Sequence, residues 1–126
     1  VVALLAESGL ALTPNAAFCG ERADMYAFSR LNDEEKDAFI RQHPAYGRIV
    51  CRCEQISEGE IRAALRREPR PLDMDGVKRR TRAGMGRCQG GFCTPHVMRL
   101  LAEESGIPED EITKHGGASA MLTGKL

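Results

Sequence analysis

The sequence predicts a small, mainly α fold, in which an irregular N-terminal arm precedes a compact helical domain. Helix-capping residues recur along the chain, and each is followed by apolar residues at helical spacing. Glycine or proline stands near most of the expected helix ends. The chain has 126 residues, enough for one modest domain or for a small domain plus an appendage.

The N-terminal third is expected to hold two helices joined by the arm. Residues 1–8 carry apolar side chains on one helical face, whereas residues 10–30 show no clean period. Asn32 precedes three acidic residues and predicts an N-cap, and Pro44 should end the helix that follows. Residues 47–51 are expected to be extended.

Three further helix starts are expected in the remaining chain. Ser57 and Glu60 form the capping-box pattern, and Asp73 is a cap for a short helix running to about residue 82. Thr94, followed by proline, predicts the third N-cap, and Gly106 should close that helix. The last expected elements are a single turn and a short strand, at residues 108–112 and 120–122.

Composition excludes several function classes. Lysine plus arginine equals aspartate plus glutamate at 18 each, and aromatics are not interleaved with the basic residues, so nucleic-acid binding is not indicated. No apolar stretch reaches the roughly 20 residues that span a bilayer, and no secretory leader is visible.

The chain begins with valine, which suggests a fragment or a processed product. Five cysteines fit a disulfide framework poorly, so a reducing cytoplasm is expected.

Four cysteines form two close pairs, C-x-C and C-x4-C, with 34 residues between the pairs: Cys51, Cys53, Cys88 and Cys93. Each pair can supply two thiolates from one loop. The core is thin, with no tryptophan and six Phe or Tyr residues, so an internal metal staple would add stability. The spacing therefore indicates a metal centre.

The surroundings of the second pair suit an anionic centre. Residues 76–99 contain six cations and no acid, and the four glycines of residues 84–91 let the backbone approach a ligand closely. Both pairs also precede an expected helix N-terminus, where N–H groups favour negative charge. These residues favour an iron–sulfur cluster, although four-cysteine zinc and disulfides or free thiols remain open at this point.

The run CRC, then KRRTRAGMGRCQGGFC, resembles the bacterioferritin-associated-ferredoxin-like (BFD-like) [2Fe–2S] domain. The resemblance covers residues 48 to about 102, through both pair spacings, the gap and the Arg/Gly-rich approach. It implies a small helical iron–sulfur domain with the cluster held in loops near helix starts. It also implies four cluster ligands: Cys51, Cys53, Cys88 and Cys93.

The flanking segments are similar to the C-terminal region of FAD-dependent oxidoreductases such as anaerobic glycerol-3-phosphate dehydrogenases. The resemblance implies a flavin domain in the parent chain and an external redox partner, with FAD bound outside this sequence and no catalytic residue within it. The expected division is a helix stub and linker arm at 1–46, the cluster domain at 47–106 and an extension at 107–126. The expected function is one-electron relay between flavin and an acceptor, in the cytoplasm or peripheral to a membrane through the parent. The alternative is a metal-stapled structural or docking domain, and a thiol-based sensor is a third interpretation.

Other candidate residues receive plainer interpretations. Cys19 stands outside the motif and is expected to be an unligated thiol. His96 follows Cys93 by three residues and is expected to lie on the surface beside the cluster, since four thiolates complete the set. The arginine run 79–82 is expected to be a solvated helix face, with charge compensation of the cluster or docking to an acidic partner as the functional alternative.

Overall fold

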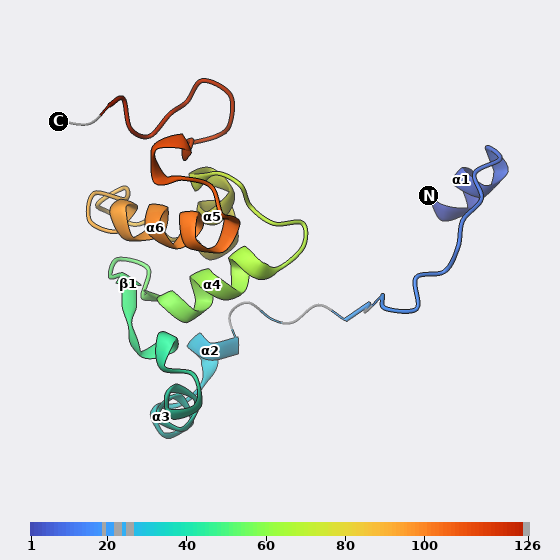
Figure 1. The fold of residues 1–126 in the computed structure, drawn as a ribbon. Coiled ribbons are helices and arrows are strands. Elements are labelled where there is room, and N and C mark those ends of the chain that lie inside the picture. The colour runs from blue at the N-terminus through green and yellow to red at the C-terminus, as the bar shows by residue number, and fades with distance from the viewer. Residues whose placement is uncertain (19, 22–23, 25–26, 125–126) are drawn as a thin grey trace.

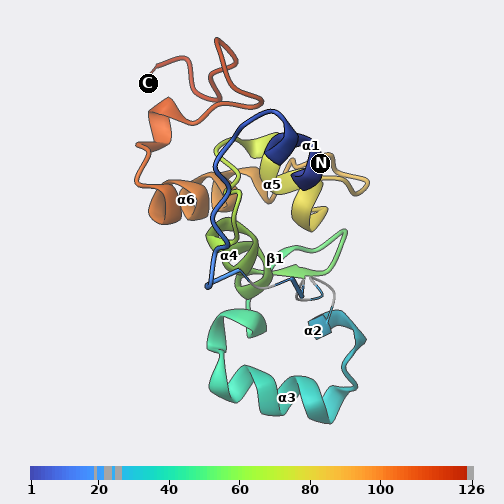
Figure 2. The ribbon, with the colours of Figure 1, turned by 90° about the vertical axis from the view of Figure 1, so that its right-hand side faces the viewer.

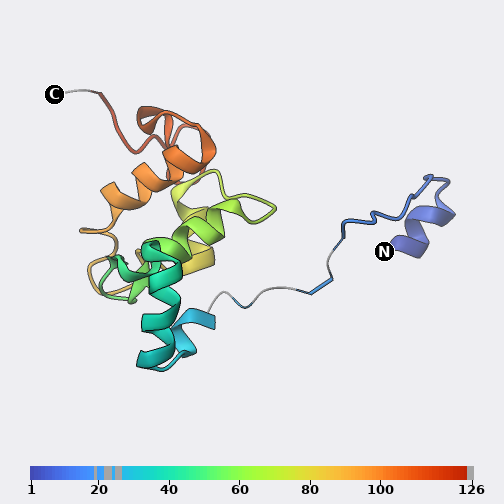
Figure 3. The ribbon, with the colours of Figure 1, turned by 60° about the horizontal axis from the view of Figure 1, so that its bottom comes forward.

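The computed structural model describes residues 1–18, 20–21, 24 and 27–124. About 47% of the described residues are helical, and a two-stranded sheet accompanies the helices. The larger helices pack together, while the first helix and the segment after it extend away from them (Figures 1 and 3). The elements in chain order are α1 (Val2–Glu7), α2 (Ala27–Arg30), α3 (Asp33–Gln42), η1 (Pro44–Gly47), β1 (Ile49–Cys51), β2 (Ile56–Ser57), α4 (Glu58–Arg66), α5 (Met74–Thr81), α6 (Thr94–Ser105) and η2 (Glu109–Glu111).

The N-terminal segment matches the expected helix and arm. Helix α1 lies within residues 1–8, and every residue from 1 to 18 is exposed. The arm also contains the short helix α2, which the sequence pattern did not indicate. Cys19 lies outside the described residues.

Helix α3 begins and ends where the sequence predicts. The Asn32 side chain accepts from the Glu35 N–H at 2.9 Å, while the Glu35 carboxylate accepts from the Asn32 N–H at 3.0 Å. The helix stops at Gln42 because Pro44 follows, and Pro44 opens the 3₁₀ turn η1. The N–H groups of Asn32 and Glu35 at the start of the helix therefore both have a side-chain acceptor.

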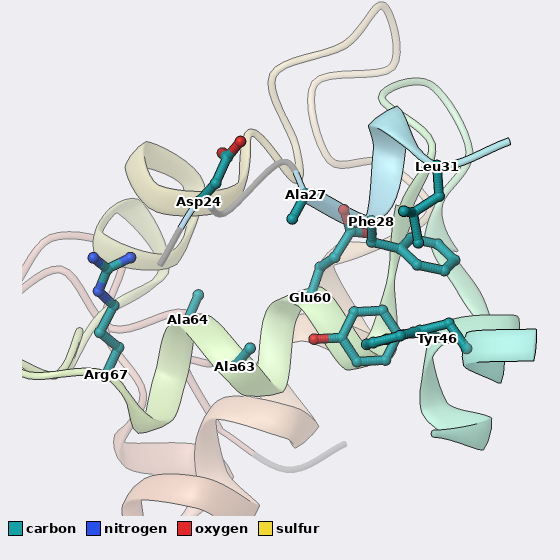
Figure 4. Close-up of a pocket in the computed structure, with 10 residues that line it drawn as sticks. Asp24, Ala27, Phe28, Leu31, Tyr46, Glu60, Ala63, Ala64 and Arg67 are labelled. Carbon is teal, nitrogen blue, oxygen red and sulfur yellow. The ribbon is translucent and has the colours of Figure 1, made fainter. Parts of the chain in front are cut away.

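Aromatic packing joins this N-terminal part to α4. The Tyr46 ring lies 5.0 Å from Phe28 and 4.8 Å from Phe39 between centroids. The same ring rests on the backbone of Gly59 in α4, where an added Cβ would lie 2.2 Å from it. A pocket of about 340 Å³ lies beside this contact, between α2 and α4, with Ala63 on its α4 side (Figure 4).

Strands β1 and β2 pair antiparallel and carry the first cysteine pair. Ile49 is opposite Ser57 and Cys51 is opposite Ile56, with an irregularity between them. The short connection between the strands places Cys53 in a turn. Figure 2 shows this hairpin beside α4. The extended segment expected at residues 47–51 is confirmed for Ile49–Cys51, which forms one strand of a hairpin, whereas Gly47 belongs to the 3₁₀ turn η1.

Helices α4, α5 and α6 enclose the core. The capping box at Ser57 is present, with the Glu60 carboxylate accepting from the Ser57 N–H at 2.8 Å. Asp73 caps α5 by accepting from the Gly76 N–H at 2.6 Å. The innermost apolar side chains come from all three helices and from the C-terminal segment: Ile61, Leu65, Val77, Val97, Leu100, Leu101 and Ile112.

The start of α6 differs from the expectation by one residue. Cys93 occupies the N-cap position, and Thr94 is the first helical residue. The Thr94 hydroxyl donates to the Gly90 carbonyl at 2.7 Å, so it is not available to cap the helix. Gly106 closes the helix with φ of 74°, as expected.

An ion-pair network links Arg48, directly before β1, with α4 and α6. Glu58 accepts from Arg48 at 2.7 Å and from Arg62 at 2.8 Å. Arg62 also reaches Glu104 at 2.7 Å. The two arginines hold the pKa of the Glu58 carboxyl down at about 2, mainly through the hydrogen bond from Arg48. The network therefore fixes the strand that carries Cys51 against the two helices.

The C-terminal segment packs on the helical core. Turn η2 lies within the turn expected at 108–112, and Ala120 forms an isolated bridge with Thr113 where a strand was expected to start. The carbonyls of Thr113 and Lys114 accept from the N–H groups of Met74 and Asp75 at the start of α5. In the described part of the chain, no helix combines the length and apolarity needed to cross a membrane.

Candidate metal centre

The four motif cysteines lie around one hollow of about 430 Å³. Cys51 comes from the end of β1 and Cys53 from the turn after it, while the second pair comes from the loop before α6 and from the helix N-cap. Figures 1 and 3 show the β1–β2 connection beside the loop that precedes α6. Residues 35 or more positions apart in sequence are thus brought to one place.

The cysteines differ in depth. Cys51 and Cys93 are buried at the inner side, with 1% and 3% of their surface exposed. Cys53 is exposed and Cys88 is half-buried, and their sulfurs are 3.5 Å apart. Among the described residues, no three His, Cys, Asp or Glu side chains converge closely enough to hold a single metal ion. The four thiols therefore surround a hollow and do not meet at one point.

Hydrogen bonds stabilise negative charge on the outer sulfur of Cys88. The pKa of its thiol lies below the ordinary value, first because Cys53 donates to it. Backbone N–H groups of the following turn also donate to this sulfur: those of Gly90, Phe92 and Gly91. The turn that joins the second cysteine pair therefore favours thiolate at its first member.

The pKa of the inner thiol of Cys93 is shifted in the opposite direction, upward. Burial and, second, negative charge on Cys51 together raise its pKa to about 11. A metal cation removes this penalty because a coordinating thiol is deprotonated outright. The inner pair is therefore suited to binding a cationic iron centre within a shielded environment.

Glycines allow the two cysteine loops to approach each other. A Cβ on Gly86 would lie 2.3 Å from the Cβ of Cys53. Gly90 has φ of 88°, and a Cβ there would lie 2.7 Å from the Thr94 hydroxyl. Gly86 thus permits the approach of the two cysteine loops, and Gly90 has the positive φ that was expected of these glycines.

The fold places the carboxylate of Glu54 against residues 76–99, a segment that contains no acidic residue of its own. Glu54, next to Cys53, accepts from Arg82 at 2.7 Å. Arg79 lies 3.9 Å from Asp73, and Arg80 donates to the carbonyl of Arg67. Arg79 and Arg82 remain exposed, at 66% and 52%, as expected for a solvated face. The run also has partners within the fold, which the sequence did not indicate.

Five other residues line the hollow, and they include His96 and Phe92. His96 is exposed and lies 3.5 Å from an Arg99 nitrogen, as the surface interpretation predicts. Phe92 lies between the cysteines of the second pair and is 83% exposed. Phe92 and Glu54 were not among the predicted site residues. An aromatic residue inside a C-x4-C loop was a visible signal for Phe92, whereas the pairing of Glu54 with a residue 28 positions away had none.

The donor set fits an iron–sulfur cluster. Four thiols from two loops surround one hollow, and N–H groups point at one of the sulfurs. Cysteine thiolates are the usual ligands of [2Fe–2S] clusters, and hydrogen bonds to the sulfurs are a principal influence on their potential.

Comparison with known proteins agrees with this chemistry. Residues 49–103 match the family model of the BFD-like [2Fe-2S] binding domain. This part of the chain belongs to that family. The BFD-like match includes all four cysteines and ends near the C-terminus of α6.

Relatives of this BFD-like chain include oxidoreductase subunits. The glycerol 3-phosphate dehydrogenase of Caloramator mitchellensis is 48% identical over 97 residues, which are 77% of this chain and 20% of that protein. Hydrogen cyanide synthase subunit HcnB of Pseudomonas aeruginosa is 45% identical over 58 residues, 46% of this chain and 12% of that protein. An anaerobic glycerol-3-phosphate dehydrogenase subunit of Escherichia coli K12 is 34% identical over 64 residues, 51% of this chain and 12% of that protein.

The matched part of the chain therefore spans about a fifth of the length of the first of these relatives and about an eighth of the others. No solved structure matches the chain. The family and the relatives together support an iron–sulfur electron-transfer module.

Proposed function

We propose that this chain binds one [2Fe–2S] cluster through Cys51, Cys53, Cys88 and Cys93 and relays single electrons between a flavin and an acceptor. The observation that carries the proposal is the gathering of these four thiols around one hollow within the family match. The proposed division of the chain places the cluster domain at residues 47–106, the linker arm before it and the extension after it.

The residues around the hollow have separate tasks in this proposal. When bound, the cluster supplies reversible one-electron chemistry. Burial of Cys51 and Cys93 keeps water from the inner side. The N–H groups that donate to Cys88 stabilise negative charge at the outer side, which favours the reduced state.

The flavin part of the proposal comes from the relatives. The segment that matches this chain is only 20% of the glycerol 3-phosphate dehydrogenase of Caloramator mitchellensis, which leaves room for a flavin domain in a parent protein. FAD exchanges two electrons and a [2Fe–2S] cluster exchanges one, so the cluster would pass electrons onward singly to an external redox partner. The proposed setting is the cytoplasm, with attachment to a membrane only through the parent.

Anaerobic purification of the 126-residue chain tests cluster binding. The expected protein is red-brown, contains two irons and two sulfides per chain, bleaches with dithionite and then gives an EPR signal, as one [2Fe–2S] cluster requires. A colourless protein with one zinc per chain after anaerobic reconstitution would instead support the structural alternative.

Ligand identity is tested by a matched pair of cysteine variants. Cys88→Ser should lose the colour and the iron because it removes one of the four proposed thiolates. Cys19→Ser should retain both. Loss of the cluster in the second variant would show that the ligand assignment is wrong.

A further inference from the structure

We propose that the open side of the thiol hollow is a docking surface for a separate electron-acceptor protein whose contact face is acidic around an apolar recess. This inference rests on the proposed electron-transfer function and adds the place and chemistry of the acceptor. The surface consists of Ile49, Arg52 and Phe92, which line the hollow, together with the exposed Arg87, which directly precedes Cys88.

Phe92 supplies an apolar anchor. The side chain is 83% exposed although the cysteine that follows it is buried. The turn that holds it is closed by a hydrogen bond from the Gly91 N–H to the Cys88 carbonyl at 3.0 Å, so Phe92 projects from an ordered loop. Ile49, 44% exposed, lines the same hollow. Exposed aromatic side chains on ordered loops are typical binding anchors, and an apolar recess is the partner feature that would receive this one.

Two arginines give this surface its charge. Arg52 lies between the cysteines of the first pair, and Arg87 directly precedes the second pair. Both are exposed, and neither forms an ion pair within the part of the chain that the structure describes. Glu54 is the nearest acid in sequence to this pair of loops, and Arg82 already binds it. The surface is therefore positive, and an acidic partner face complements it.

The outer sulfurs make this side suited to electron exit. Cys53 is exposed and Cys88 half-buried, while Cys51 and Cys93 are covered by the core. A partner can therefore approach the cluster most closely across Cys53 and Cys88. The N-terminal arm leaves the helical core on the side away from these loops, so it does not cover the surface (Figures 1 and 3).

The test for docking uses two haem proteins of contrary charge, acidic cytochrome b5 and basic cytochrome c, both oxidised, with the cluster-loaded chain. We expect the Kd for cytochrome b5 to rise roughly tenfold between 10 and 200 mM salt, because salt screens attraction between opposite charges. Cytochrome c should bind more weakly at low salt. Binding of cytochrome c in preference to cytochrome b5 would overturn the inference.

Two double variants of equal net charge separate local from overall electrostatics. Arg52→Glu with Arg87→Glu should abolish the preference for cytochrome b5. Arg41→Glu with Arg70→Glu, which changes α3 and the loop after α4, should retain it. Equal binding by the two double variants would overturn the local charge argument. Phe92→Ala should weaken cytochrome b5 binding at least tenfold, as expected for an interface anchor, and unchanged binding would overturn the anchor.

Electron transfer is measured separately. Dithionite reduces the cluster by one electron, excess reductant is removed, and that electron reduces the ferric haem of cytochrome b5 to the ferrous state. The rate should fall as salt rises. Salt-sensitive binding without haem reduction would count against the proposed function and leave docking intact. A reducible cluster with no charge preference would count against docking alone. Sedimentation tests whether a second copy of this chain occupies the surface instead. If the chain self-associates, loses that association on Phe92→Ala and does not bind cytochrome b5, the surface would be assigned to a second copy.

Discussion

Replacing Gly86 with alanine should displace Cys53 from the cluster site. The new methyl carbon would lie 2.3 Å from the Cβ of Cys53, whereas non-bonded carbons rest about 3.5 to 4.0 Å apart. The two loops must therefore separate by about 1.2 to 1.7 Å at this point. The backbone of Gly86 does not have a positive φ, so alanine introduces a clash without a conformational penalty.

This displacement is large compared with the tolerance of a metal site. Metal–ligand distances vary by only about 0.2 Å, so a shift of more than about 1 Å removes Cys53 from ligation unless the loop distorts. Overpacking of this kind costs about 1–3 kcal/mol in stability. We expect the purified variant to hold less than about half of the wild-type iron and sulfide, because either ligation or loop geometry must be lost.

Gly91→Ala is the matched control. A Cβ there would lie 3.2 Å from the Cys88 carbonyl oxygen, which requires a movement of only a few tenths of an ångström. Iron, sulfide and visible absorption should be close to wild type in this variant. Urea unfolding of both proteins without iron separates cluster loss from general unfolding. A Gly86→Ala protein with full iron content and an unchanged spectrum would refute the steric reasoning.

Three further changes test other parts of the structure. Glu58→Gln should lower the unfolding free energy at pH 7 by about 1–2 kcal/mol. The fall of the Glu58 pKa to about 2 limits the loss to about 3 kcal/mol, and solvent screening of its exposed partner Arg48 reduces it below that limit. Because that pKa is depressed, wild-type stability from this pair is complete above about pH 4.5 and is lost as pH falls toward 2, so urea titrations of the variant should show a shallower acid decline. Ile112→Ala should cost about 2–4 kcal/mol in the same assay because the side chain is fully buried; a loss below about 1 kcal/mol would contradict its place in the core. Arg82→Glu should lower the cluster potential, since it adds negative charge and leaves Glu54 unneutralised, while Arg79→Glu should shift it less; equal potentials by redox titration would show that the site does not sense this pair.

Local signals predicted the helix starts well where the capping side chain acts on its own helix. Asn32, Ser57 and Asp73 all cap as expected, because each bond closes within three residues. Thr94 failed because its hydroxyl had a competing acceptor, the Gly90 carbonyl, created by the glycine turn before it. A capping pattern in the sequence cannot include an acceptor that exists only after the preceding loop folds.

The candidate site shows the same division. The cysteine spacing and its resemblance to a known family identified the four cysteines that line the hollow. The different depths of the two pairs were not visible, since they depend on how α6 and the hairpin pack. The Arg82–Glu54 ion pair was also not visible, because it joins segments 28 residues apart. Charge counted along the sequence overstated the positive field at the site.

The C-terminal segment has a consequence for the size of the folding unit. Two of the first backbone donors of α5 are satisfied by carbonyls at residues 113 and 114, and the rest by the Asp73 cap. Ile112 belongs to the same buried core as Val77 of that helix. The family match ends at residue 103, before any of these groups. A chain cut at that boundary would keep every motif cysteine yet expose an apolar cavity and leave two helix donors to water, so the cofactor motif and the autonomous folding unit have different limits in this protein.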